Sequence, residues 1–295
     1  MCEFKTYHPI VNFTYFLLVI GFSMFLMNPI CLAISLGGGL CYSAILGGRQ
    51  AFWRNIALTL PMLIIAALMN PAFNHEGVTI LTYLPSGNPL TLESIIYGGA
   101  AGMMIAGVVC WFSCYNAVMT SDKFIYLFGR IIPSLSLILS MTLRFVPRFA
   151  AQLKEVSNAQ RCIGRDVSNG SILKRAKHGL AILSIMVTWA LENSVETADS
   201  MKSRGYGLSG RTAFSIFTFD GRDRNTLLCI ILLGIYILIG SINGAVSFRY
   251  FPSIKAESFS AYGVSLYAAH LALCILPVII EVWEGCKWKA IKSKI

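Results

Sequence analysis

The residues best suited to ionic chemistry lie between Lys123 and Arg224, in an otherwise apolar chain. Two short clusters in this stretch combine arginine with glycine. Arginine is favoured at the negative C-terminal end of a helix, and glycine just past that end adopts the left-handed conformation that closes it. Both clusters are therefore predicted to be helix ends. Their members are Arg161, Cys162, Ile163, Gly164 and Arg165 in the first, and Ser203, Arg204 and Gly205 in the second.

Enzyme chemistry of the chain's own is not expected. Glu192 and Asp199 with Lys202 form a weak candidate for an intramembrane enzyme, and no Gly-x-x-x-x-Gly-Lys-Ser/Thr phosphate loop occurs. Residues 37–39 are all glycine but no lysine follows, so close helix packing is the favoured role. Cys110 and Cys114 share a helix face without a histidine or a second cysteine pair beside them, so no metal site is expected. We predict no cofactor and no metal, and an energised role would need an ATPase on a separate chain.

Two long helices must position the arginine–glycine clusters. The first is predicted over about 133–162 and ends at Gly164; the second is predicted over about 171–203 and ends at Gly205. Asn-Gly at 169–170 is a turn signal between them, and the serine that follows suits an N-cap. The second helix is apolar in its middle, which predicts partial burial before its charged end.

The charges on these helices form two stripes of opposite sign. Spacings of three and four residues place each set on one helix face. The basic stripe is Lys154, Asn158, Arg161 and Arg165, and the acidic stripe is Glu192, Glu196 and Asp199. Opposite signs allow the helices to cross and pair. Exposed ion pairs contribute only about 0–1 kcal/mol each, so docking another protein explains the arrangement better.

The composition indicates an integral membrane protein. Hydrophobic residues make up 56% and charged residues 13%, with a mean hydropathy of +0.66, whereas soluble domains are about a quarter charged. The net charge of +10 raises the alternative of nucleic-acid binding. The bases lie mostly between apolar runs, which is typical of loops that face cytoplasm and anionic lipid, so no nucleic-acid partner is expected.

The apolar runs predict an all-α fold with about six transmembrane helices. A span needs about 20 mostly apolar residues. The predicted spans are residues 11–27, 30–46, 56–69, 92–118, 227–240 and 262–282. Three regions follow: a four-span part at 1–118, a cytoplasmic or interfacial part with the two long helices at 119–225, and a two-span part at 226–295. Gly98, Gly102 and Ala106 give the fourth span a small-residue face for close helix contact.

The segment 131–151 decides the topology. With Lys5 inside, the first spans leave Arg49 and Arg54 inside and the base-free loop 72–91 outside. If 131–151 crossed the membrane, the bases that follow it would face outward, against the positive-inside rule. We therefore expect 131–151 to lie in or along the cell membrane, and both termini to be cytoplasmic.

At these residues the sequence resembles the transmembrane (T) component of energy-coupling factor transporters, the family that includes the cobalt-uptake subunit CbiQ. Ser203-Arg204-Gly205 resembles the Ala-Arg-Gly motif that ends each of that family's coupling helices. Residues 143–147, Leu-Arg-Phe-Val-Pro, resemble the Leu-Arg-Phe-Leu-Pro signature. Ala159-Gln160-Arg161 and His8-Pro9 also fit, and the similarity covers about residues 8–220. The first motif departs, with Ile163 where the family has arginine.

The resemblance implies a non-catalytic subunit of an ATP-driven importer. Its expected partners are the lipid bilayer, two ATP-binding-cassette ATPase subunits and a substrate-binding (S) membrane subunit that takes up a vitamin or a metal ion. Arg204 would anchor one ATPase, and Ile163 or a flanking arginine would contact the other. The alternative is a stand-alone secondary transporter, which predicts acids or bases at mid-membrane depth. The predicted spans place Glu93 and Glu281 only near their ends.

Overall fold

The computed structural model describes residues 3–83, 89–129, 132–208, 217–256 and 260–292. The chain divides into two compact units, one formed by Met1–Phe124 with Phe217–Ile295 and the other by Ile125–Ile216. The predicted N-terminal and C-terminal membrane regions thus pack into one unit, and the two long helices belong to the other.

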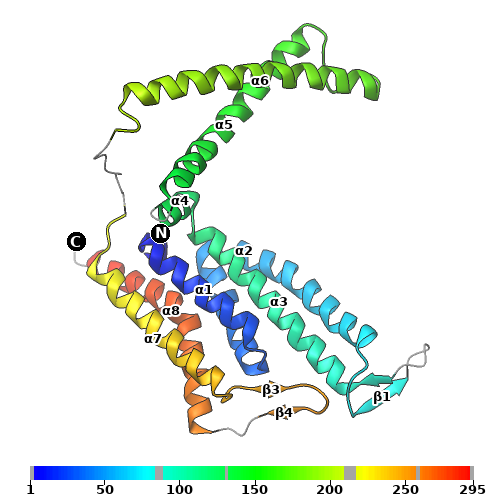
Figure 1. Ribbon diagram of the computed structural model, residues 1–295. Helices are drawn as coiled ribbons and strands as arrows, with labels where there is room; N and C mark the ends of the chain where they lie inside the picture. Colours follow the sequence, from blue (N-terminus) through cyan, green and yellow to red (C-terminus); the bar gives the residue numbers. More distant parts are fainter. Residues whose placement is uncertain (1–2, 84–88, 130–131, 209–216, 257–259, 293–295) are drawn as a thin grey trace. The chain divides into compact units, whose positions relative to one another are not determined.

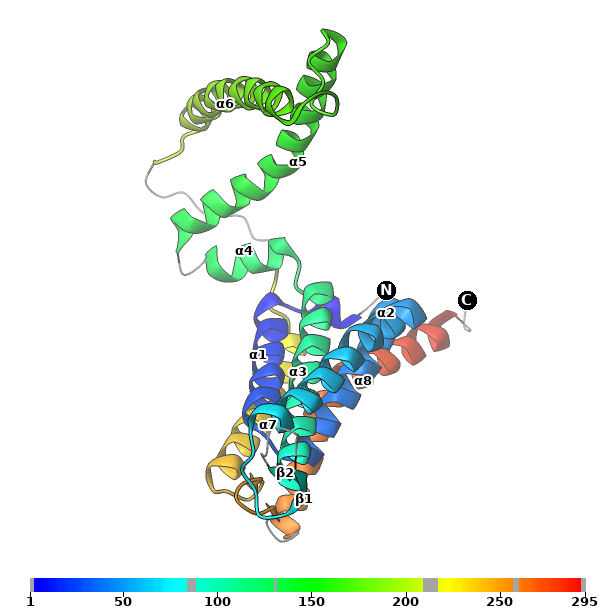
Figure 2. The same cartoon turned by 90° about the vertical axis from the view of Figure 1, so that its right-hand side faces the viewer.

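The first unit is a helical bundle with two short β-hairpins at one end (Figures 1 and 2). Its helices are the 3-10 helix η1 (Glu3–Thr6), α1 (Pro9–Phe25), α2 (Pro29–Phe73), α3 (Leu92–Val118), α7 (Gly221–Ile242) and α8 (Ala261–Lys292). The antiparallel hairpins are β1 (Ile80–Tyr83) with β2 (Pro89–Thr91), and β3 (Phe248–Arg249) with β4 (Lys255–Ala256). The sequence predicted only helices, so these hairpins are an addition to an otherwise mostly helical fold.

The first two helices begin in the same way. The His8 side chain accepts a hydrogen bond from the backbone N–H of Ile10, and the Asn28 side chain accepts one from Ile30. Each cap is followed by a proline, whose missing N–H costs nothing in the first helical turn. His8-Pro9 and Asn28-Pro29 are therefore local sequence signals for the start of a helix.

The long segment α2 is two helices that reverse direction at Gly48, where the backbone leaves the helical region at φ 65° and ψ −163°. Asn55, buried beyond the reversal, donates a 2.6 Å hydrogen bond to the Ser43 hydroxyl before it. Twelve residues of straight helix would separate these two positions by about 18 Å, so the chain must fold back. The Ser113 hydroxyl on α3 donates to the side-chain amide oxygen of Asn55 at 3.1 Å and ties the reversal to a third helix. The separate helices predicted over 30–46 and 56–69 are confirmed as the two arms of α2.

Small residues let α3 pack closely against both arms of α2. A Cβ atom on Gly102 would lie 2.8 Å from the Leu63 carbonyl oxygen, and one on Gly98 would lie 3.0 Å from that of Ala67. On the other arm, a Cβ on Gly39 would lie 3.3 Å from the Cys110 sulfur. The predicted roles of the small-residue face of α3 and of the glycine run in close helix packing are confirmed.

Aromatic side chains fill the centre of the bundle. Tyr15 and Phe16 of α1 and Tyr42 of α2 surround Trp111 of α3, with ring centroids 6.0–6.5 Å apart. The Trp111 indole N–H donates to the hydroxyl oxygen of Ser35 at 3.0 Å, so the buried ring keeps a hydrogen bond.

Polar contacts define two ends of the bundle. At one end, Glu281 of α8 accepts the backbone N–H groups of Glu3 and Phe4 at 3.0 and 3.1 Å. Asp223 of α7 accepts from the His8 N–H at 3.2 Å at the same end. At the other end, where the hairpins lie, Asn28 donates to the Val246 carbonyl at 3.3 Å. The start of α1, the start of α7 and the end of α8 therefore lie together.

Four helices of the described residues are long and apolar enough to cross a membrane: α2, α3, α7, and α8 over Ala261–Trp288. The apolar helix α1 has 17 residues and falls just below that length. The helix that contains most of 131–151 is not among them. The protein is an integral membrane protein with several apolar helices.

The second unit contains two long helices that match their predicted bounds. α5 covers Pro133–Cys162 and α6 covers Ile172–Ser203, and α4 (Ser121–Gly129) lies at the boundary between the units. Ser171 occupies the N-cap position of α6, as predicted, without a side-chain cap hydrogen bond. Proline at 147 is accommodated inside α5.

The approach of α3 to α2 can be tested with two leucine substitutions on one helix. Gly102→Leu would force a side chain against the backbone of Leu63, which cannot move aside, whereas a Cβ atom on Gly99 would meet open space, with no neighbouring atom within 4 Å. We expect Gly102→Leu to destabilise the protein by about 1–3 kcal/mol and Gly99→Leu to have little effect. Thermal unfolding in detergent, followed by tryptophan fluorescence, measures the difference. Equal midpoints for the two variants would contradict the packing.

Candidate functional site

The candidate site consists of α5, α6 and their C-terminal ends. The two helices pass each other in opposite directions, with Phe149 of α5 against Trp189 of α6 at a ring-centroid distance of 5.1 Å. The Arg148 guanidinium lies 5.6 Å from the centroid of the same indole ring, a cation–π contact. Ile182 and Met186, the buried residues of α6, lie toward the N-terminal side of this crossing.

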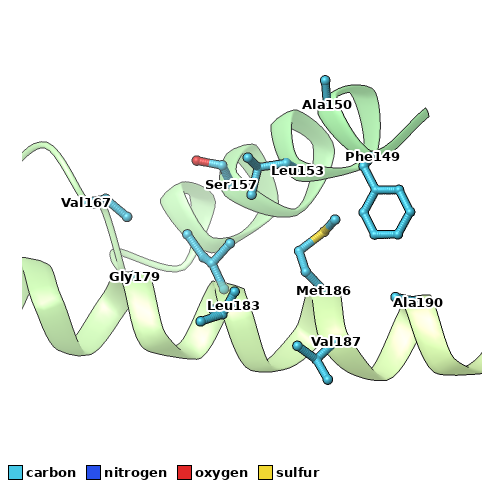
Figure 3. A pocket seen from close by; sticks show the side chains of 11 residues that line it. Phe149, Ala150, Leu153, Ser157, Val167, Gly179, Leu183, Met186, Val187 and Ala190 are labelled. Carbon is cyan, nitrogen blue, oxygen red and sulfur yellow. The ribbon is translucent and has the colours of Figure 1, made fainter. Parts of the chain in front are cut away.

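An apolar hollow of about 580 Å³ adjoins the crossing on the side of the α5–α6 connection. Figure 3 shows Phe149, Leu153 and Met186 lying between the two helices, with Gly179 and Val167 toward the connection. The apolar middle predicted for α6 is confirmed as its packing surface.

The first arginine–glycine cluster closes α5 with a Schellman motif. The Gly164 N–H donates to the Arg161 carbonyl at 3.0 Å, and the Arg165 N–H donates to the Gln160 carbonyl at 2.9 Å. Gly164 has φ +78°, in the left-handed region that glycine adopts without strain. Ile163 is the last residue before this glycine, and 62% of its surface is exposed.

The second cluster closes α6 with the same motif. The Gly205 N–H donates to the Lys202 carbonyl at 2.9 Å, and the Tyr206 N–H donates to the Met201 carbonyl at 3.0 Å. Gly205 has φ +77°. Arg204 stands directly before this glycine and is exposed. Arg204 and Ile163 therefore occupy the same position in two helix ends of the same geometry.

The C-terminal ends of α5 and α6 lie at similar distances from the point where Phe149 meets Trp189. From Phe149 to Cys162 is 13 residues along α5, and from Trp189 to Ser203 is 14 residues along α6. At 1.5 Å per residue, each end is about 20 Å along its helix from the crossing. Because the helices run in opposite directions, the ends belong to opposite arms of the pair.

A local ion pair follows the first helix end. Arg161 lies 3.4 Å from Asp166 in the connection between the helices. The Ser168 hydroxyl and backbone N–H, and then the Arg161 guanidinium, hold the pKa of Asp166 below its ordinary value. Arg161 thus contacts its own loop although 70% of its side chain stays exposed, and Ile163 is exposed beside it.

The two charge stripes do not face each other, so the pairing that their opposite signs allowed is not formed. The face of α6 that carries Glu196 and Arg204 meets Arg144 and Arg148, which lie N-terminal to the crossing on α5. Lys154 and the rest of the basic stripe lie C-terminal to the crossing, toward the other arm of α6. Arg165 also lies beyond the end of α5 and does not continue the stripe. The spacing of charges indicates which residues share a helix face, but it contains no information on where two helices cross.

Three features of the site were not predicted from the sequence. They are the crossing at Phe149 and Trp189, the similar distances from this crossing to the two helix ends, and the position of Arg144 and Arg148 facing α6. The aromatic and arginine spacing along 144–149 is visible in the sequence, but the partner of each residue depends on tertiary packing.

The fold and the site define an integral membrane protein that combines an apolar helical bundle with a pair of long amphipathic helices in a second unit. The profile of the CbiQ family, described as cobalt transport protein, matches residues 7–214, and the chain belongs to this family. The resemblance found in the sequence is confirmed.

Several relatives are named energy-coupling factor transporter transmembrane protein EcfT. That of Lactobacillus helveticus is 35% identical over 109 residues, covering 37% of this chain and 39% of the relative. That of Lactococcus lactis is 32% identical over 108 residues, covering 36% and 41%. A Mycoplasma pneumoniae protein named MG181 homolog is 26% identical over 180 residues, covering 57% and 42%. The matches span about two fifths of the length of these relatives.

The left-handed glycine of the second helix end can be tested against a helical glycine of the same helix. Gly205→Ala places a Cβ where φ is +77°, which costs about 1–2 kcal/mol, whereas Gly179→Ala lies within α6 and has open space around it. We expect faster amide hydrogen exchange over the last turn of α6 in Gly205→Ala alone, measured by mass spectrometry. Unchanged exchange at residues 200–206 in that variant would show that the Schellman motif does not hold the helix end.

Proposed function

We propose that this chain is the membrane-embedded coupling subunit of an energy-coupling factor importer. It passes the movement of two ATP-binding-cassette ATPase subunits to a substrate-binding (S) membrane subunit, which releases a vitamin or a metal ion into the cell. The chain itself carries out no chemical reaction. Membership of the cobalt transport family and the EcfT relatives support this role.

The observation that carries the proposal is the matched pair of helix ends. Two exposed ends with the same Schellman geometry, on equal arms of one helix pair, suit two ATPase subunits that move relative to each other. A displacement applied at one end is transmitted through a helix, which is stiff along its axis, to the crossing and to the other arm. Loose loops at the same positions would absorb the displacement.

The two ends differ in chemistry, and so must their ATPase grooves. Arg204 suits a groove lined by carboxylates, where a buried arginine is a frequent hot spot of binding. Ile163 suits an apolar groove, because 62% of its surface is free to be covered. Ser203 and Cys162, each at the last helical residue, and Arg161 and Arg165 around Gly164 complete the two contact regions.

The apolar surface of the helix pair suits the substrate-binding subunit. The hollow beside the crossing is lined almost entirely by apolar side chains, among them Leu153, Leu183 and Val187 (Figure 3). A membrane-embedded partner can cover such a surface, and a change in the angle of the two arms would then alter the surface presented to it.

The lysine and arginine residues are unevenly distributed between the two ends of the helical bundle, which suggests how the bundle is oriented in the membrane. Lys5, Arg222 and Lys287 lie at the bundle end where Glu281 meets the N-terminal segment, and Arg249 and Lys255 lie at the hairpin end. Among the described residues, six apolar helices alternate in direction when the two arms of α2 are counted separately (Figure 1). By the positive-inside rule we infer that both termini are cytoplasmic and that the second unit lies on the cytoplasmic side of the membrane, at its surface.

The ATPase contact can be tested by charge reversal at matched positions. Arg204→Glu should weaken capture of one purified ATPase subunit by about 30-fold or more, corresponding to about 2 kcal/mol, because a carboxylate would face the acidic groove. Lys174→Glu is the control, since Lys174 is equally exposed but lies in the first turn of α6, far from the helix end. Co-purification from detergent with each ATPase separately measures the effect.

Ile163→Glu should weaken capture of the other ATPase and leave the Arg204-dependent one unchanged. Equal capture by wild type, Arg204→Glu and Ile163→Glu would overturn the assignment of the helix ends.

A further inference from the structure

A second hollow between α5 and α6 lies on the opposite side of the crossing from the apolar one. Its volume is about 670 Å³, and it is lined by one face of each helix. From α5 it takes Met141, Arg144, Phe145 and Arg148, a spacing of three, four and seven residues. From α6 it takes Asn193, Glu196, Thr197, Ser200, Met201 and Arg204, which also share one face.

The charge in this hollow is unbalanced. Arg144, Arg148 and Arg204 supply three positive charges against the one negative charge of Glu196, a formal excess of two. Among the residues that the structure describes, the ion pair found is Arg161 with Asp166, so no carboxylate lies within ion-pair distance of these three guanidinium groups. An anion entering the hollow would offset the mutual repulsion of the arginines.

The lining combines the groups that recognise a phosphate. Guanidinium groups bind phosphate oxygens through paired hydrogen bonds, and the hydroxyl groups of Thr197 and Ser200 are further donors. The Arg148 guanidinium is held over the Trp189 ring, which restricts its position beside the hollow.

Apolar side chains accompany these donors. Met141, Phe145 and Met201 line the hollow itself, and Leu143 and Val146 on the adjoining surface of α5 are 40% and 59% exposed. A ligand with an anionic head and an aliphatic body fits this combination, whereas inorganic phosphate or a soluble phosphate ester would use only the arginines. The chain is an integral membrane protein and is therefore surrounded by phospholipid.

We propose that this arginine-lined hollow binds the phosphate group of an anionic phospholipid, with the acyl chains along the apolar side chains of α5. The lipid would link the two helices at the arm that ends in Arg204. Arg204 lines this hollow and also ends the arm proposed to dock an ATPase, so the test alters Arg144 and Arg148, which lie on α5 outside both helix ends.

The test uses the full-length chain purified in detergent with a mixture of phosphatidylglycerol and phosphatidylcholine, and native mass spectrometry of the lipid that stays bound. We compare wild type with the double variant Arg144→Gln/Arg148→Gln. The control is Lys154→Gln/Lys174→Gln, which removes the same charge from the two helices outside the hollow. We expect wild type and control to retain phosphatidylglycerol in preference to phosphatidylcholine, and the double variant to lose that preference by about tenfold or more.

Two further measurements make the result decisive. Arg148→Lys keeps the charge but loses the paired hydrogen bonds, so an intermediate preference in a chain of unaltered helicity would support a built phosphate site. Equal preference in wild type and double variant, or equal loss in the double variant and the control, would overturn the proposal. Displacement of phosphatidylglycerol by millimolar inorganic phosphate would assign the site to free phosphate and would also overturn the lipid assignment.

Discussion

The packing of Phe149 against Trp189 is the contact on which the site depends. Two long amphipathic helices have many possible relative positions, and this aromatic contact, with Leu153 and Met186 beside it, selects one. It determines which residues face each other: Arg144 and Arg148 meet the C-terminal half of α6, and the basic stripe of α5 does not. It also divides each helix into arms, so that the two capped ends lie about 20 Å along their helices from one crossing.

In the first unit the main constraint is different: polar side chains and backbone groups inside an apolar bundle must find hydrogen-bond partners. Without water, each polar side chain needs a partner within the protein. Asn55 meets this requirement at the Gly48 reversal by bonding to Ser43 and Ser113, which ties three helical segments together. Glycines at 98 and 102 then let α3 approach α2 closely, so that many small contacts replace the hydrophobic driving force that is weak between helices in lipid.

Local signals determined most of what the sequence could predict. Gly164 and Gly205 marked the ends of α5 and α6, because a left-handed residue after a helix favours glycine for steric reasons that act within one turn. Hydropathy placed the apolar helices for the same kind of reason. Whether the charge stripes pair could not be predicted, because it depends on where the helices cross, and this is determined by the contact of Phe149 with Trp189, 40 residues apart in the sequence. The equivalence of Ile163 and Arg204 was suggested by the motif, and the matching hydrogen bonds give it a geometric basis.

The central claim, that this helix pair transmits a neighbour's movement, is tested most directly by the distance between the two helix ends. Spin labels at Cys162 and at Lys202→Cys, in a chain with the other cysteines replaced, report that distance by double electron–electron resonance. In a complex with the two proposed ATPase subunits, the distance distribution should change between the nucleotide-free and the ATP-bound state and should return after hydrolysis. An identical distribution in all nucleotide states, in a complex that still transports, would contradict the account.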